Sequence, residues 1–127
     1  MPNPESREQQ PDYIAKILND IEHAPELIQA ELDRTDNPWI ACFISRATAV
    51  FGSVDLAKRN MQISNEAYAA AKKVIDSLNQ QIPYWRNKAF KSKVRMLPDE
   101  AKDQLMSELN SIWGILNPES ADEQKEA

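Results

Sequence analysis

Side chains suited to catalysis or metal binding are scarce in this sequence. It has one histidine, His23, and one cysteine, Cys42, which excludes a Cys/His zinc site within one chain. The acidic residues have no Glu-x-x-His spacing beside them, and no serine lies in a Gly-x-Ser-x-Gly motif. We therefore predict no catalytic residue, no metal ligand and no cofactor. A small enzyme that uses His23 and nearby carboxylates is kept as the second alternative.

Cys42 lies inside the longest strictly apolar run, the six residues from Trp39 to Ile44. A free cysteine in such surroundings is commonly a small buried hydrophobe, and the nearest basic residue along the chain, Arg46, is a helical turn away. We expect a structural role for this thiol. Six apolar residues are also too few to span a bilayer, and no lipidation motif is present, so we predict no membrane partner.

The stretch 84–95 combines aromatic and basic side chains and is the candidate binding site. On a helical wheel, residues 84–97 form a short basic amphipathic helix. Trp85 and Phe90 are the expected apolar anchors, because aromatic residues and Arg dominate the energetics of many interfaces. The expected steering charges are Lys88, Lys91 and Arg95. The full candidate set is Tyr84, Trp85, Arg86, Lys88, Phe90, Lys91, Lys93 and Arg95.

Charge is unevenly distributed along this acidic chain, whose net charge is -5. Residues 61–97 carry seven Lys/Arg and two Asp/Glu, whereas residues 1–60 carry six and ten, and residues 98–127 carry two and eight. One interpretation is structural: the basic block faces the acidic helices within a bundle or across a dimer, where each pair adds about 0–1 kcal/mol. The other is that the basic block binds a partner.

Three kinds of partner are compatible with this basic block. A protein is the leading candidate, and the mechanism would be docking that blocks, bridges or stabilises that partner. Nucleic acid is the alternative, since bases could stack on the aromatic residues of 84–95, although the acidic total charge opposes it. A second copy of the chain is the third, because acidic and basic blocks of similar size predict a homodimer.

Apolar residues recur at helical spacing along most of the chain, and no strand pattern competes with them. The predicted helix 38–51 is apolar nearly all round, which is typical of the centre of a domain. Gly52 and Ser53 are expected to end or kink this helix before residues 54–61, and Pro83 to break the fourth. The predicted helices are 11–24, 25–34, 38–51, 64–81 and 98–116, with 84–97 as a separate short helix.

These elements predict an all-α fold, a single-domain bundle of four to five helices over residues 11–116, with the helix 38–51 near its middle. Residues 1–10 and 117–127 are polar and without period, so we expect a disordered arm and a disordered acidic tail. The lone thiol and the lack of a secretory signal in 1–10 predict a cytoplasmic protein. The leading functional hypothesis is a non-enzymatic adaptor, inhibitor or assembly factor.

Overall fold

Five α-helices follow one another along residues 12–117, the part of the chain that this computed structural model describes. They are α2 (Tyr13–Glu22), α3 (Ala24–Arg34), α4 (Trp39–Arg59), α5 (Asn65–Ser92) and α6 (Asp99–Leu116). The predicted all-α class is confirmed. The predicted arm 1–10, the helix start at Pro11 and the tail beyond Asn117 lie outside the described residues.

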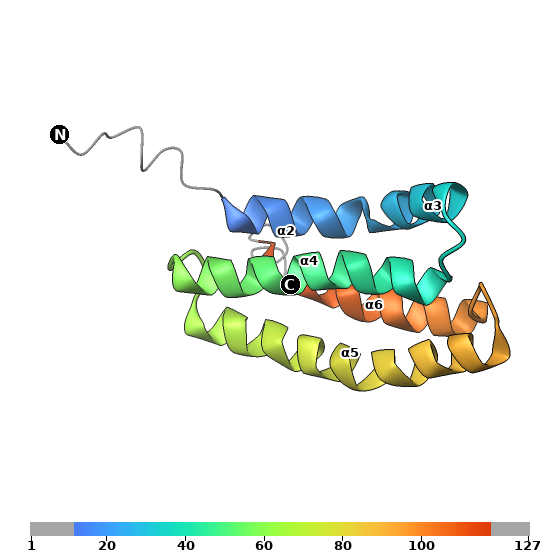
Figure 1. Ribbon diagram of the computed structural model, residues 1–127. Coiled ribbons are helices and arrows are strands. Elements are labelled where there is room, and N and C mark those ends of the chain that lie inside the picture. Colours follow the sequence, from blue (N-terminus) through green and yellow to red (C-terminus); the bar gives the residue numbers. More distant parts are fainter. Residues whose placement is uncertain (1–11, 118–127) are drawn as a thin grey trace.

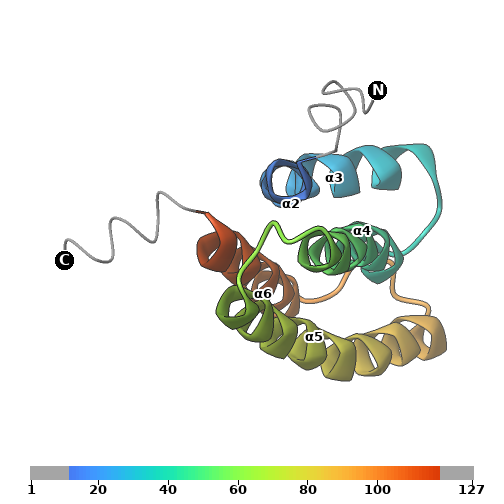
Figure 2. The same ribbon diagram turned by 90° about the vertical axis from the view of Figure 1, so that its left-hand side faces the viewer.

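The helices form a bundle in which successive long helices run in opposite directions (Figures 1 and 2). The helix α2 contacts both α4 and α6, and α5 also contacts both α4 and α6. The helix α4 also contacts α3, so it packs against three of the other helices. The prediction of a central apolar helix is therefore confirmed.

Local signals explain where the first two helices begin and end. Asp12 caps α2, since its Oδ1 accepts a hydrogen bond of 3.0 Å from the N–H of Ala15. The helical conformation is interrupted at His23. Pro25 lies in the first turn of α3, where a missing N–H costs nothing. The predicted break near Pro25 is present.

The helix α4 is longer than its sequence suggested. The expected end or kink at Gly52 and Ser53 is wrong, because α4 continues through both residues to Arg59. The buried positions Val50, Val54 and Ala57 keep one face of the helix in the core across the glycine. A glycine in a helix costs only about 1 kcal/mol relative to alanine, and packing of this face outweighs that cost.

The helix α5 is also longer, because Pro83 lies inside it and does not break it. Residues 84–92 therefore belong to α5, and the prediction of a separate helix 84–97 is wrong. Ile82 and Ala89, on either side of the proline, are both buried, whereas Pro83 is exposed. The helix is bowed, with its concave side toward α4 and α6 (Figure 1), the direction expected for a proline on the solvent face.

The core lies where α4 meets its neighbours. Phe43 is fully buried and stacks on Trp39 with a ring-centroid distance of 5.2 Å. Judged by length and composition alone, α4 could cross a membrane: its 21 residues include a window of mean hydropathy 1.4. Of that window 44% is buried against other helices. The core helix of a soluble protein passes the same test, so the evidence for a membrane segment is weak.

Candidate functional site

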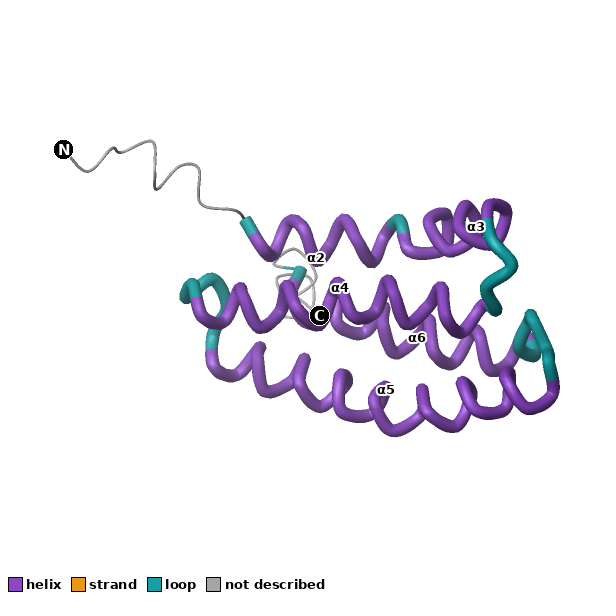
Figure 3. Tube along the Cα trace, in the orientation of Figure 1, coloured by secondary structure: helices purple, strands orange, loops and turns teal. Residues whose placement is uncertain are grey.

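The candidate segment 84–95 spans the last turns of α5 and the loop that leads to α6. The helix ends at Ser92, and Lys93 adopts a left-handed conformation with φ 53° and ψ 39°. The N–H of Val94 then donates to the carbonyl oxygen of Ala89 at 3.0 Å. This is a Schellman motif, and it turns residues 93–98 into a loop toward the α3–α4 connection (Figure 3).

Arg95 fastens this loop to the α3–α4 connection. Its Nη2 donates hydrogen bonds to the carbonyl oxygen of Leu32 and, at 2.7 Å, to that of Thr35. These carbonyls lie at the C-terminal end of α3, where the helix dipole favours a cation. The carbonyl oxygen of Arg95 accepts from the N–H of Trp39 at 2.7 Å. Arg95, which we expected to be a steering charge, therefore holds two loops together.

Cys42 lies next to the same junction. Burial of the thiol is the main cause that raises the pKa of Cys42 from 9.0 to about 11, and hydrogen bonding to Glu31 and the negative charge of Glu31 raise it further. The charge of Arg95 opposes this shift. A thiol that remains protonated at neutral pH is a poor nucleophile, which agrees with the structural role expected for Cys42.

Tyr84, Trp85 and Lys88 form an aromatic–cation cluster on α5. The two rings meet edge to face at a centroid distance of 4.9 Å. The ammonium of Lys88 lies 5.7 Å from the Tyr84 centroid and 5.5 Å from that of Trp85, within the range of cation–π attraction. Trp85 is half-buried and packs against the core, whereas Tyr84 is 57% exposed.

Three apolar side chains around the end of α5 face solvent. Phe90 is 63% exposed, and Val94 and Met96 are each 41% exposed. Phe90 was an expected anchor, but Val94 and Met96 were not among the candidate residues. A helical wheel placed Val94 beside Leu97, but residues 93–98 form a loop in which Leu97 is buried and Val94 is exposed. No glycine marks the end of α5, so the sequence contains no signal that predicts this loop.

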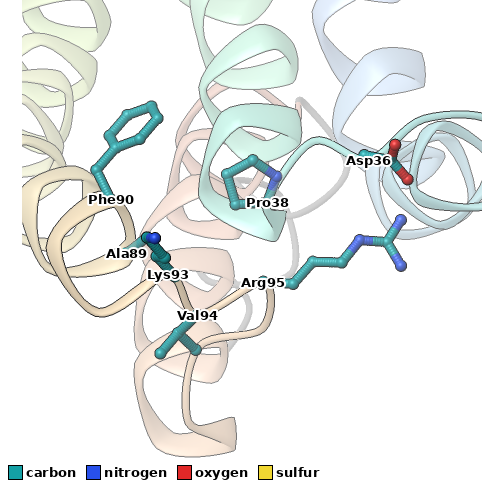
Figure 4. Close-up of a pocket in the computed structure, with 7 residues that line it drawn as sticks. All are labelled: Asp36, Pro38, Ala89, Phe90, Lys93, Val94 and Arg95. Carbon is teal, nitrogen blue, oxygen red and sulfur yellow. The ribbon is translucent and has the colours of Figure 1, made fainter.

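Hollows surround this loop. One of about 230 Å³ is lined by Phe90, Lys93 and Arg95 on one side and by Pro38 and Asp36 on the other (Figure 4). Another, of about 190 Å³, shares the lining residues Ala89 and Val94 with it. A more polar hollow of about 350 Å³ is lined by Tyr84, Asn87, Lys88, Lys91 and Ser92.

The basic side chains of the segment form no ion pair with an acidic side chain of the described residues. Within residues 12–117 the ion pairs are His23–Glu26 at 3.4 Å and Lys102–Asp99 at 3.3 Å. Neither pair includes a residue of 84–95. Arg86, Lys88, Lys91 and Lys93 are all exposed. The structural interpretation of the basic block, in which it pairs with the acidic helices of the same bundle, finds no ion pair in the described part of the chain.

His23 lies between the first two helices, at the surface. It occupies the exposed junction between α2 and α3, and its Nδ1 lies 3.4 Å from the exposed Glu26 carboxylate. No hollow described above includes it. Among residues 12–117, no three His, Cys, Asp or Glu side chains are grouped so that they could hold a metal ion.

The fold and this surface thus define a helical bundle with an exposed basic and aromatic end. No family model, no curated protein and no solved structure matches the chain.

Proposed function

We propose that this protein is a non-enzymatic interaction protein that docks on a protein partner through the 84–95 segment. The observation that carries this proposal is the pairing of exposed aromatic side chains, Tyr84 and Phe90, with cations that have no acidic partner in residues 12–117. Aromatic residues and Arg are enriched at the energetic centres of interfaces, and exposed Lys charges beside them steer an oppositely charged partner.

Within this proposal, the roles that we assign to the residues of the segment differ from those expected from the sequence. Phe90 replaces Trp85 as the main exposed anchor, because Trp85 already packs against the core. We expect Phe90→Ala to weaken partner binding by about 1–2 kcal/mol with little change in stability. Trp85→Ala should lower the free energy of unfolding by about 2 kcal/mol or more, since it removes a large, half-buried side chain. Thermal unfolding and binding titrations of both variants separate the two roles.

Affinity purification from the native host tests the proposal. The bait is the full chain, and the test variant is the double substitution Lys88→Glu and Lys91→Glu. Lys72→Glu with Lys73→Glu is the matched control, since it makes the same charge change at the other end of α5. A protein retained by the wild type and the control, and lost by the test variant, supports the proposal. Equal recovery with all three baits contradicts it.

Nucleic-acid binding through the same segment remains the alternative, favoured by the exposed ring of Tyr84 beside Lys88 and Lys91. It predicts a steep loss of affinity with added salt. Fluorescence anisotropy with a labelled single-stranded oligonucleotide at two salt concentrations tests it. Absence of binding at low salt removes this alternative.

A further inference from the structure

The hollows around the α5–α6 loop lie next to one another, because neighbouring hollows share lining residues. Val94 lines both the 230 Å³ and the 190 Å³ hollow. Met96 lines the 190 Å³ hollow and a further one of about 210 Å³, which is bordered by Trp39 and Met106. These volumes lie below the roughly 300–1,000 Å³ typical of small-molecule sites. Each is suited to single side chains of a partner instead.

Cations border these apolar hollows. Lys93 lines the 230 Å³ hollow, and Lys88 lines both the 190 Å³ hollow and the polar one of about 350 Å³, which it shares with Lys91. Arg95 is held by the carbonyl oxygens of α3, so its position is fixed. Two acids also line the series: Asp36 at the α3–α4 connection, and Asp103 at the 210 Å³ hollow, where Lys102 lies beside it. Apolar hollows with three lysines at their edge favour a partner that brings apolar side chains and carboxylates together.

We propose that the α5–α6 corner, meaning Phe90, Val94 and Met96 with Lys88, Lys91 and Lys93, binds an acidic amphipathic segment of the partner protein. Apolar side chains of that segment enter the hollows beside Val94, and its carboxylates meet the lysines. This inference rests on the proposed function and adds the chemistry of the partner.

Two observations favour a peptide segment over a nucleic acid at this corner. The Lys88 ammonium already lies over the rings of Tyr84 and Trp85, so a base that stacks there must displace it. The exposed apolar side chains of this corner are a valine and a methionine as well as a phenylalanine. Aliphatic side chains offer buried apolar area but no ring on which a base can stack.

The test uses two labelled synthetic peptides of sixteen or so residues with the same number of glutamates. One carries leucines at helical i, i+3, i+4, i+7 spacing, and the other carries alanine at those positions. We expect the leucine peptide to bind the full chain at least tenfold more tightly than the alanine peptide, as measured by fluorescence anisotropy. Equal affinities would mean that charge alone is recognised, and would overturn the inference.

Variants locate the binding. Phe90→Ser combined with Val94→Ser should reduce affinity for the leucine peptide at least tenfold, and Lys91→Glu should reduce it for both peptides. Leu56→Ser is the matched control, because Leu56 is an exposed apolar residue on α4, and it should bind like the wild type. Circular dichroism checks that each variant is folded. Unchanged binding by the Phe90/Val94 variant overturns the inference.

The outcomes separate this inference from the proposed function. If the native partner is captured in a Lys88- and Lys91-dependent way but neither peptide binds, the proposed function stands and the acidic amphipathic segment is wrong. If an oligonucleotide binds more tightly than the leucine peptide and competes with it, both the inference and the leading function fall to the nucleic-acid alternative.

Discussion

Met61 and Lys93 end α4 and α5 in the same way, although neither is a glycine. Their φ angles are 59° and 53°. The following N–H groups, of Gln62 and Val94, donate to the carbonyl oxygens of Ala57 and Ala89 at 2.8 Å and 3.0 Å. A side chain in this left-handed region costs about 1 kcal/mol or more, so both helix ends carry a local strain that glycine would relieve.

Met61→Gly should therefore stabilise the protein by about 1 kcal/mol. Met61 is 91% exposed, so its removal sacrifices little packing. Urea unfolding measures the gain as a higher midpoint. Met61→Ala is the control, since alanine keeps a Cβ in the left-handed conformation and should bring no gain. An equal gain from both substitutions would show that the strain is not the cause.

The Cys42 thiol makes stability depend on pH in the alkaline range. Its pKa is about 11 in the folded protein and 9.0 when it is free of this environment. The raised pKa stabilises the fold fully below pH 9, and this contribution is lost as the pH rises to about 11. Two pKa units correspond to about 3 kcal/mol.

The comparison that isolates this effect is wild type against Cys42→Ala. The difference in their free energies of unfolding should be constant up to pH 8 and should then move in favour of the variant by about 2 kcal/mol at pH 11. Chemical denaturation at a series of pH values measures it. A difference that does not change with pH contradicts the hydrogen-bonded, buried thiol.

At the scale of elements, α5 shows packing that overrides a helix breaker. Proline in a helix interior removes one hydrogen bond and costs about 3 kcal/mol. Leu78, Ile82 and Ala89 are buried along one face of α5 on both sides of Pro83, and their burial offsets that cost. The helix α5 is bowed (Figure 2), and Pro83 occupies an exposed position within it.

Pro83→Ala should restore the missing hydrogen bond and stabilise the protein by about 2 kcal/mol. The exposed position of Pro83 means that little packing is lost. Thermal and urea unfolding measure the gain. A loss of stability would instead show that the bend is needed for Ile82 and Ala89 to pack together.

Gly52→Ala is a second change within an element and should add about 1 kcal/mol of stability. A Cβ at Gly52 would meet no atom within 4 Å, so the gain in helix propensity meets no steric opposition. Differential scanning calorimetry should show a higher Tm. A lower Tm would mean that the glycine serves a purpose that the structure of α4 does not explain.

At the scale of the whole molecule, the charged blocks predict self-association. The basic side chains of 84–95 are exposed, and exposed acids lie on α3 and α6, among them Asp33 and Asp103. Opposite charges on two copies attract, and salt screens that attraction. Light scattering should detect a dimer at low salt and a shift toward monomer at high salt. A monomer at high protein concentration in low salt contradicts the prediction.

Much of this architecture follows from local patterns in the sequence. The all-α class, the helix break beside Pro25, the start of α6 with Asp99 and Glu100 in its first turn, and the central apolar helix were all predictable. Each depends on residues close together in the chain, where side-chain periodicity and helix capping act directly. The clustering of basic and aromatic residues in 84–95 was also visible, because it is a property of composition.

Only the tertiary structure decided the rest. From the local sequence alone, Gly52 and Pro83 predict helix ends. Both helices nevertheless continue through these residues, because the helix faces around them are buried. From the sequence, Arg95 is expected to be a free charge. In the fold its guanidinium donates to the carbonyl oxygens of Leu32 and Thr35, which lie about sixty positions earlier in the chain. The exposure of Val94 and Met96 depends on the left-handed conformation of Lys93. Since Lys93 is not a glycine, the sequence did not predict this conformation. The physical reason is the same in each case: the deciding contact or conformation depends on free energy from parts of the chain that are distant in sequence.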